Sequence, residues 1–536
     1  RSMKRVLLSS ALLLVSTLTF AQSKVSGTVK DANGEPLVGV SVMEVGTNNG
    51  AVTDINGNYT LNVKPGAKLK LSYIGFTPQT VKAGSNNQIV LQEDNTALNE
   101  VVVVGYGTMR RKDVTSSITT VKAEDLNRGV FTDPGQMLQG KVPGLVVSST
   151  ADPNGSPTIT LRGASTLRTG AMSPYYVVDG IPGVDISIVS PEDIESIDVL
   201  RDATATAIYG SKAANGVIII TTKKGSKERT NVTYNGYVAI DNILKKFDVC
   251  TADDLRQYAK DNNITLKDGG ANTDWQDEVL RTGISHNHNV NISGGNGSTN
   301  YMVSADLRKR EGVIKMTGFD RFNVRSLVST KTLKDHLTIS IGANMMYGKH
   351  FGVPSGNEGA SVLDAMNYYS PTNAVKNADG TWTVGSGSKN YNPLALMEEN
   401  KSETVWKRNQ FVGKTALELW KGLVWNVNYS WSNYQSTYSA YNTRNSQLEG
   451  IGNKNGQATR NTYFGREQTF ETYLNYNFTA GKNKFDLMAG YSWEEKRNND
   501  GFGLSVEGYY NDDLGWYNMS YAQTILGVQN SVQSGY

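Results

Sequence analysis

The sequence predicts a mainly β fold in three parts: a small N-terminal β-sandwich, a mixed α/β segment, and part of a large transmembrane β-barrel. Three observations lead to this prediction. Short β-branched runs separated by Asn-Gly and Pro-Gly turns precede residue 92, glycine-rich α/β patterns follow up to about residue 225, and long alternating strands fill the remainder. Because 536 residues exceed what one ordinary core accommodates, several domains are expected.

The first 21 residues have the features of a secretory signal peptide. Lys4 and Arg5 form a cationic start, residues 6–20 are predominantly apolar, and Ala21 completes a small-x-small cleavage site. The two residues before Met3 look like a start-site artefact. We therefore expect the mature, exported chain to begin near residue 22.

Composition excludes several classes of function. Three of the 53 basic side chains lie in the leader, so the mature chain has 50 basic and 50 acidic side chains. It lacks the basic footprint that a nucleic-acid partner requires. The single cysteine, Cys250, excludes a disulfide framework. After the leader no segment has the ~18–20 apolar residues of a spanning helix, so entry into a membrane would require a closed barrel.

Residues 22–95 are predicted to form the β-sandwich. Asn33-Gly34, Asn56-Gly57 and Pro65-Gly66 supply the positive φ that tight hairpins need. The pattern Asp54-x-Asn56-x-Asn58 is similar to the start of a calcium loop, but Tyr59 stands where that loop needs glycine. The spacing therefore favours a hairpin.

This segment resembles the carboxypeptidase regulatory-like domain. The similar residues are V-S-G-T-V-K-D-A-N-G-E-P-L-V-G-V (25–40) and T-D-I-N-G-N-Y (53–59). The family name suggests zinc, yet the segment contains no histidine. The resemblance therefore implies an adaptor rather than a metal site.

Residues 96–113 are predicted to be a tether around a short strand. Four consecutive valines, 101–104, follow Glu100 and precede a Gly-Tyr-Gly turn, with polar sequence on both sides. Valine is stiff and favours extended backbone. A short strand on a tether can add to the sheet edge of another protein; the alternative is an ordinary strand of a neighbouring domain.

Residues 114–228 combine four extended runs with short helical pieces. The runs are 157–163, 175–180, 194–200 and 216–222, and residues 202–210 are predicted to form a short helix with a glycine cap. The motifs Q-G-K-V-P-G-L (139–145), I-T-L-R-G (159–163), P-Y-Y-V-V-D-G-I-P (174–182) and I-D-V-L-R-D-A-T-A-T-A-I-Y-G-S-K-A-A-N-G-V-I-I-I-T-T-K-K-G (197–225) closely resemble the plug domain of TonB-dependent outer-membrane transporters.

Together with the preceding adaptor, these motifs are similar to the SusC/RagA branch of those transporters. The resemblance implies that Arg162 and Asp179, and the pair Arg201 and Asp202, brace the plug against itself or the barrel wall through charge-assisted hydrogen bonds. The plug-motif residues that we single out are Arg162, Gly163, Asp179, Gly180, Arg201, Asp202, Tyr209 and Gly210.

The resemblance also assigns the valine run to a TonB box. Its residues would be Glu100, Val101, Val102, Val103, Val104, Gly105 and Tyr106, which would pair with the sheet of TonB and its inner-membrane energy complex. Further implied partners are a SusD-like surface lipoprotein, outer-membrane lipid, and an oligosaccharide or peptide ligand. The adaptor and the TonB box would lie on the periplasmic side of the outer membrane.

Residues 229–536 are predicted to form part of the barrel. Trp425, Val427, Tyr429 and Trp431 share one face of a strand and polar residues occupy the other, which suits a lipid-facing band and a wet lumen. A soluble sandwich would also alternate, but with more Lys and Glu on its polar face. We expect roughly ten strands here, whereas a plugged barrel of this type needs ~22. We also expect the residues after Gly527 to lack a long closing strand, so the chain is predicted to be the N-terminal portion of a longer transporter.

Sequence motifs for catalysis are absent. His286 and His288 could share one face of a strand, but no third metal ligand is visible, and no G-x-S-x-G or H-E-x-x-H occurs. We expect no enzyme activity, catalytic residue, metal or cofactor. Candidate ligand contacts lie in the long connection 351–405, although aromatic residues of this kind also form barrel belts. These candidates are Tyr368, Tyr369, Trp382 and Tyr391.

The predicted function is TonB-dependent import of a nutrient across the outer membrane, with the plug gating the barrel. The expected cargo is an oligosaccharide, with an oligopeptide as the alternative. A receptor for iron chelates or cobalamin, and a non-transporting adhesin or signalling protein, are the rival functions.

Overall fold

The computed structural model describes residues 23–32, 34–47, 49–73, 76–84, 87–92, 101–104, 107–110, 118–131, 133–148, 155–163, 172–201, 207–225, 229–353, 361–387, 390–448 and 454–535. The predicted signal peptide lies outside these residues. The chain forms two compact units, Arg1–Ser116 and Ser117–Tyr536, and each is described by itself.

The first unit contains a sandwich of two sheets. One sheet has the order β4-β1-β7 and the other β3-β2-β5-β6. Alternate residues of both sheets, among them Val29, Val42, Leu61 and Leu71, are buried in one shared apolar core. The strands are β1 (Ser23–Lys30), β2 (Ser41–Glu44), β3 (Gly50–Val52), β4 (Asn58–Val63), β5 (Lys68–Ser72), β6 (Gln79–Lys82) and β7 (Asn87–Val90).

The turns of the sandwich have the predicted conformation. Gly34, Gly57 and Gly66 all have positive φ. The carboxylate of Asp54 accepts hydrogen bonds from the backbone N–H groups of Asn56 and Asn58, at 2.9 and 2.8 Å. This carboxylate therefore stabilises a turn, as the hairpin prediction required. Strand β6, which is short and polar, was not predicted.

The four valines form a strand that is paired within the chain. β8 (Val101–Val104) is antiparallel to β9 (Gly107–Arg110), with Val101 opposite Arg110 and Val104 opposite Gly107. Glu100, Gly105 and Tyr106 lie outside the described residues.

The plug begins the second unit and is built on a five-stranded mixed sheet. Its strand order is β10-β15-β16-β13-β14, and a separate hairpin pairs β11 with β12. Ile197, Val199, Ile218 and Ile220 are at most 1 % exposed within its core. The strands are β10 (Ile118–Lys122), β11 (Leu145–Ser148), β12 (Thr158–Leu161), β13 (Tyr175–Val178), β14 (Ile181–Pro182), β15 (Ile194–Leu200) and β16 (Val217–Thr222).

Short 3₁₀ segments connect these strands. The predicted helix at 202–210 differs from the structure: η5 spans Ala207–Ala213, and Gly210, with φ of 62° and ψ of −151°, interrupts it rather than ending it. Asp202 lies outside the described residues. The remaining segments are η2 (Pro134–Leu138), η3 (Ile186–Ile188) and η4 (Pro191–Asp193).

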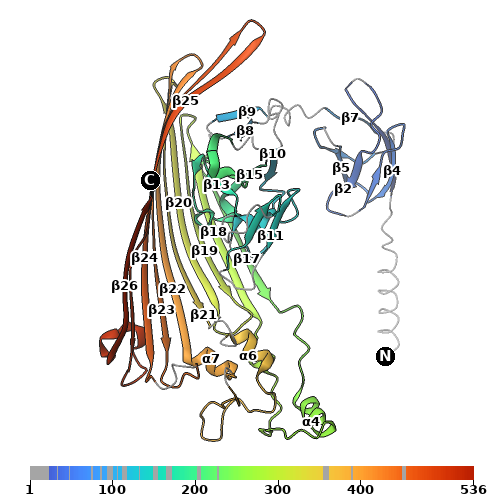
Figure 1. The fold of residues 1–536 in the computed structure, drawn as a ribbon. Coiled ribbons are helices and arrows are strands. Elements are labelled where there is room, and N and C mark those ends of the chain that lie inside the picture. The colour runs from blue at the N-terminus through green and yellow to red at the C-terminus, as the bar shows by residue number, and fades with distance from the viewer. Residues whose placement is uncertain are drawn as a thin grey trace, which may run out of the picture. The chain divides into compact units, whose positions relative to one another are not determined.

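A ten-stranded antiparallel sheet curves around one side of the plug and forms the barrel wall (Figure 1). Its strands follow chain order, so β17 and β26 are its edges. They are β17 (Asn231–Asp241), β18 (Gly283–Gly295), β19 (Thr299–Glu311), β20 (Gly318–Thr332), β21 (Leu337–Gly352), β22 (Asn400–Trp420), β23 (Leu423–Asn442), β24 (Gln457–Ala480), β25 (Asn483–Glu507) and β26 (Thr524–Gly535).

The ten strands agree with the expected number, but they are longer than the alternating runs seen in sequence. The strands β21, β23, β24 and β25 are 16 to 25 residues long. The alternating runs seen in sequence, 337–344, 425–432, 470–478 and 485–493, cover only the parts of these strands next to the turns that join β20 to β21, β22 to β23 and β24 to β25. The residues after Gly527 belong to β26, a strand of 12 residues that pairs with β25 and forms an edge of the sheet. Apolar alternation was the only strand signal used, and it fades where both faces become polar.

The two faces of the wall differ as predicted. Facing the plug, Asn287, Asn289, Asn323 and Asn428 are at most 7 % exposed. The opposite face forms an exposed apolar band. Its members on β21–β25 include Ile341, Met345, Phe411, Trp425, Tyr429, Leu474, Leu487, Tyr491 and Trp493.

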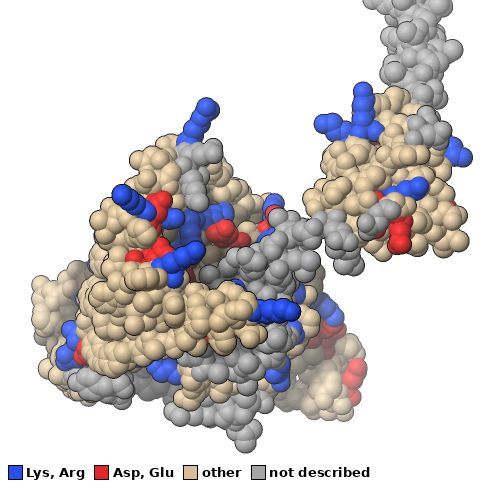
Figure 2. Space-filling model, turned by 90° about the horizontal axis from the view of Figure 1, so that it is seen from above, with Lys and Arg blue, Asp and Glu red and all other residues tan. Residues whose placement is uncertain are grey.

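Connections differ at the two ends of the wall. Short turns join β18 to β19, β20 to β21, β22 to β23 and β24 to β25, at the top of Figure 1. The other end has long connections with helices α4 (Ala252–Asp261), α5 (Trp275–Val279), α6 (Val362–Tyr368), α7 (Pro393–Glu399), η6 (Gly515–Tyr517) and η7 (Met519–Tyr521). Among the described helices, none is long and apolar enough to cross a membrane. Seen from the short-turn end, acidic and basic side chains are interspersed (Figure 2).

The apolar band predicts a depth-dependent response to charge. Ile341 lies midway along the band on β21 and is 64 % exposed, so Ile341→Arg should destabilise the chain in a bilayer by about 2–4 kcal/mol. Leu337→Arg, on the same face at the short-turn end of β21, should cost at most about 1 kcal/mol. Urea titrations of folding into lipid vesicles measure both values, and equal effects would contradict the bilayer placement of the band.

Candidate functional site

The plug meets the wall at a two-residue turn between β13 and β14. Val178 pairs with Ile181, which leaves Asp179 and Gly180 as the turn, with φ of 49° and 77°. Positive φ at both positions is the mark of a type I′ hairpin, for which Asp-Gly is a preferred sequence. The turn projects the Asp179 carboxylate beyond the end of β13.

Asp179 is held by groups from both the plug and the wall. Within the plug, Thr222 donates to the carboxylate from its backbone N–H and its hydroxyl, at 2.9 and 2.6 Å. From strand β20 of the wall, Arg325 Nη2 lies 2.9 Å from Asp179 Oδ2. From strand β22, Lys414 Nζ donates to the Asp179 carbonyl. Two cations of the wall therefore converge on one plug turn.

This surrounding keeps Asp179 ionised. Burial alone would raise the pKa of its carboxyl, but the positive charges of Arg325 and Lys414 and the hydrogen bonds of Thr222 hold the pKa below its usual range. Arg325 is only 9 % exposed, so loss of the carboxylate would leave a cation buried with incomplete compensation.

Two further plug carboxylates pair with wall arginines. Glu192 of the plug contacts Arg308 Nη2 of β19 at 3.0 and 3.2 Å, and Asn287 of β18 donates to Glu192 at 2.9 Å. Asp185 contacts Arg408 Nη1 of β22 at 2.6 Å. We call these two pairs and the Asp179–Arg325 pair the arginine clamps.

Hydrogen bonds to backbone carbonyls of the plug add to the clamps. Asn323 of β20 and Asn344 of β21 both donate to the Ile188 carbonyl, at 2.7 and 2.9 Å, and Arg321 donates to the Ser187 carbonyl at 3.2 Å. A short 3₁₀ segment, η3, presents these carbonyls because its last backbone acceptors have no partner within the helix. The wall therefore satisfies backbone groups of the plug as well as its charges.

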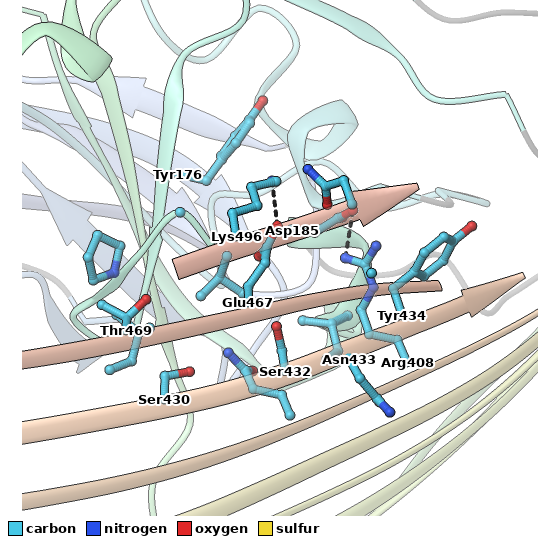
Figure 3. Close-up of a pocket in the computed structure, with 18 of the residues that line it drawn as sticks. Tyr176, Asp185, Arg408, Ser430, Ser432, Asn433, Tyr434, Glu467, Thr469 and Lys496 are labelled. Atoms are coloured by element: carbon cyan, nitrogen blue, oxygen red, sulfur yellow. Dashed lines mark ion pairs between the residues drawn. The ribbon is translucent and has the colours of Figure 1, made fainter. Parts of the chain in front are cut away.

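A cavity of about 720 Å³ lies between the plug and strands β22–β25 (Figure 3). The plug contributes Tyr176 and the segment 181–185, and the wall contributes hydroxyl, amide and charged groups. Two ion pairs lie in the cavity: Asp185 with Arg408, and Glu467 with Lys496 (Figure 3). Among the wall groups are Gln410, Ser430, Ser432, Tyr434, Ser436, Tyr463, Thr469 and Asn498.

The chemistry of the cavity suits a polyhydroxylated ligand. Serine, threonine, asparagine and glutamine offer both donors and acceptors, and the tyrosines offer flat apolar faces with a polar edge. The Arg408 guanidinium stacks over the ring of Tyr434 at 4.8 Å while it pairs with Asp185. A ligand in this cavity therefore lies next to one of the arginine clamps.

The other plug-motif residues lie within the plug. Arg201 donates to the Pro143 carbonyl at 3.1 Å, which ties the plug to itself. The ring of Tyr209 packs on that of Tyr175, with centroids 5.9 Å apart. Arg162 and Gly163, both with positive φ, follow the end of β12. Among the motif residues, Asp179 forms an ion pair with the wall.

The candidate aromatic residues occupy a separate layer at the long-connection end. Tyr369 and Tyr391, 2 % and 8 % exposed, lie in an apolar cluster with Trp275. Trp382 donates to Glu399 at 2.6 Å and receives the Lys376 ammonium on its face. Tyr368 is 81 % exposed. Packing accounts for Tyr369 and Tyr391; ligand contact by any of the four stays a prediction.

Sequence reasoning missed the wall cations. Arg308, Arg325, Arg408 and Lys414 all occupy plug-facing positions of long strands. A basic residue on the polar face of an alternating strand was the available signal, because a lumen position without a counter-charge would be costly. Of the plug carboxylates, Asp185 is the N-cap of η3 and Glu192 lies within η4, and neither had a comparable signal.

Comparison with known proteins gives matches over nearly the whole chain. Residues 110–217 match the family model of the TonB-dependent receptor plug domain, and residues 25–103 match that of the CarboxypepD_reg-like domain. The chain is 33 % identical over 528 residues to the TonB-dependent receptor SusC of Bacteroides thetaiotaomicron, covering 91 % of this chain and 52 % of that protein.

A second relative gives the same proportions. The chain is 33 % identical over 520 residues to the TonB-dependent receptor P3 of Formosa agariphila, covering 94 % of this chain and 51 % of that protein. The chain thus spans about half the length of the curated relatives it matches. Among solved structures, the RagAB peptide importer in its open-open state superposes with a TM-score of 0.70 at 21 % identity, covering 81 % of this chain and 53 % of that one. That likeness concerns the fold.

Loss of the Asp179–Arg325 clamp is predicted to make local opening of the plug easier. Asp179→Asn should lower the free energy of opening of the plug around β13 and β16 by about 3 kcal/mol, because it leaves two wall cations poorly compensated. Hydrogen exchange of amides 175–182 and 217–222 measures this value. Since the pKa of Asp179 is lowered, the difference from the wild type should hold above pH ~4 and vanish as the pH falls through that pKa.

The matched control is Asp125→Asn, at an exposed plug position. It should leave exchange unchanged. Equal exchange in the Asp179 and Asp125 variants at neutral pH would contradict the clamp.

Proposed function

We propose that this chain, a member of the SusC/RagA family of TonB-dependent transporters, imports a nutrient across the outer membrane through a plug-gated barrel. The observation that supports this most strongly is the plug fastened to the inner face of the wall by the three arginine clamps. Such a plug blocks the lumen at rest, and the pairs are few enough to be broken by an applied force. Import then requires an energy source and a cargo site.

The energy source in this proposal is TonB with its inner-membrane energy complex. Strand β8 would add to the sheet of TonB and transmit its pull to the plug. Each backbone hydrogen bond contributes only ~1 kcal/mol net, so the pairing is reversible. In the structure β8 has one neighbour, β9, within the described residues. Its other edge, or the edge freed by release of β9, is the surface offered to TonB.

The cargo in this proposal is an oligosaccharide held in the cavity beside Arg408. The cavity is lined chiefly by hydroxyl and amide groups with tyrosine rings. It also holds two ion pairs, and the opposite charges within each pair neutralise one another. Neutral sugars offer many hydroxyls and apolar ring faces, which match such a lining. An oligopeptide is the alternative cargo.

The proposed surroundings follow from the two ends of the wall. The long connections would lie outside the cell, where a SusD-like lipoprotein would cover the entrance, and the short turns would face the periplasm. The apolar band would contact outer-membrane lipid. The adaptor and β8 would lie in the periplasm.

A proline in the valine strand tests the coupling to TonB. Val102→Pro removes a backbone donor and should abolish energised uptake, while surface expression and binding of the sugar stay at wild-type levels. Uptake of a labelled oligosaccharide pool by cells, beside equilibrium binding of the same pool, measures this separation. Val52→Pro in the adaptor strand β3 is the control for a general effect of proline on export. Normal uptake by Val102→Pro would overturn the proposed pairing of β8 with TonB.

Filling the cavity tests the cargo site. Ser432→Trp would occupy the space between the wall and the plug (Figure 3) and should lower the affinity for the transported sugar at least about tenfold, equivalent to ~1.4 kcal/mol. Gly413→Trp is the matched control, since Gly413 has open space around its Cβ position and pairs with outward-facing Tyr429. Isothermal titration with an oligosaccharide pool, then a peptide pool, measures both variants. Loss of peptide binding alone would assign the cavity to peptides.

A further inference from the structure

A second cavity lies on the other face of the wall, away from the plug. Its volume is about 240 Å³. The cross-strand pairs Lys407–Gln435, Val405–Thr437 and Glu403–Ser439 line it, together with Arg460 opposite Ser439. These positions have the same strand parity as outward-facing Phe411 and Tyr429. The cavity therefore opens to the surroundings of the barrel.

The connection between β25 and β26 forms one side of this cavity. Tyr441, which shares the outward parity, packs edge-on against Tyr509 at 5.3 Å and donates to Asp512 at 2.7 Å. These contacts fasten the connection to the outer face of the wall, and they place Trp516 and Tyr517 at the cavity.

The cavity lies just beyond the apolar band on the side of the long connections. Phe411 and Trp431 pair across β22 and β23, with ring centroids 5.8 Å apart, and mark the limit of the band on these two strands. Gln435 follows Trp431 by four residues, or roughly 13 Å along the strand. In an outer membrane this height corresponds to the sugars and anionic groups of the outer leaflet rather than to the acyl chains.

Two of the three charged residues at the cavity are basic and form no ion pair within the described part of the chain. Glu403 pairs with Lys349 at 2.6 Å, so its charge is neutralised. Lys407 and Arg460, both exposed, form no ion pair with the carboxylates of the described part of the chain. Around them stand the amide of Gln435 and the hydroxyls of Thr437 and Ser439. Two cations, sugar-type hydrogen-bonding groups and an aromatic face thus share one outward cavity.

We propose that this outward cavity binds an anionic saccharide headgroup of an outer-leaflet glycolipid. Lys407 and Arg460 contact its phosphate or carboxylate, and Trp516 covers a sugar ring. The inference rests on the outer-membrane placement proposed above, but it concerns a site separate from the cargo cavity. The occupant is lipid-borne, because the cavity lies on the same outward face as the band that contacts acyl chains, with the pair Asn409–Asn433 between them.

The test measures binding of purified lipopolysaccharide to the full chain folded in detergent. The double variant Lys407→Ala/Arg460→Ala should lower the affinity about tenfold, because it removes both cations that contact the anionic group. The matched control removes two exposed lysines at the short-turn end, Lys421→Ala/Lys482→Ala, and should bind like the wild type. Thr437→Trp fills the cavity without changing charge and should lower affinity similarly.

Three outcomes would overturn the proposal. The first is equal affinity of the Lys407/Arg460 and Lys421/Lys482 double variants for lipopolysaccharide. The second is unchanged binding of chemically dephosphorylated and decarboxylated lipopolysaccharide, which would exclude an anionic ligand. The third combines two results: the deacylated, water-soluble saccharide binds as tightly as intact lipopolysaccharide, and vesicles that contain lipopolysaccharide do not retain the chain. Together they would assign the site to free sugars.

The result is separable from the proposed import. Sugar uptake by cells that express Lys407→Ala/Arg460→Ala should stay at the wild-type level, because neither residue lines the cargo cavity. Absence of uptake in the wild type would reject import without altering the lipopolysaccharide measurement. Loss of lipopolysaccharide binding with normal uptake in the double variant would support the proposed site alone.

Discussion

The contact of Asp179 with Arg325 and Lys414 joins the plug to the wall, and much of the second unit is arranged around it. The carboxylate is available because an Asp-Gly turn directs it out of the plug sheet. The two cations are available because β20 and β22 pair through β21 in a continuous register. A slip of one residue in either strand would turn its cation toward lipid. Buried charges tolerate such an error poorly, since each isolated ion costs several kcal/mol.

The clamps and the proposed cargo cavity, the cavity between the plug and β22–β25, share Arg408. Its guanidinium pairs with Asp185 of the plug and stacks on Tyr434 of the cavity lining. A ligand that displaces the Tyr434 ring or competes for the guanidinium would weaken a plug contact directly. A single side chain, Arg408, therefore links occupancy of the cavity to attachment of the plug, because it contacts both. This link offers a physical basis for releasing the plug when cargo is present.

The outer face of the wall changes character along its length. Apolar and aromatic residues cover the part nearer the short turns, and charged and amide groups cover the part nearer the long connections. Strands of 20 to 25 residues exceed the ~9–11 residues needed to cross a bilayer. In the proposed outer-membrane placement, the wall therefore extends beyond the bilayer, where its outward side chains can bind ligands of their own.

Much of the fold could be predicted from local pattern. The sandwich turns, the four plug runs and the two faces of the wall follow from turn residues and from the period-2 alternation of side chains in strands. The prediction failed where that pattern is weak. Strand β6 is too short and polar to stand out, and the parts of β22–β25 nearer the long connections lose their apolar alternation because both faces are polar there.

The sequence by itself determined the three-part organisation, the apolar outward face and the candidate status of Asp179. Only the tertiary structure decided which groups meet. Asp179 and Arg325 are 146 residues apart in the chain, and their pairing depends on the register of several antiparallel strands and on the depth at which the plug sits. The cargo cavity and the outward cavity arise in the same way, each from three or more strands brought side by side. Local sequence specifies which face a side chain occupies, whereas non-local register specifies its neighbours across that face.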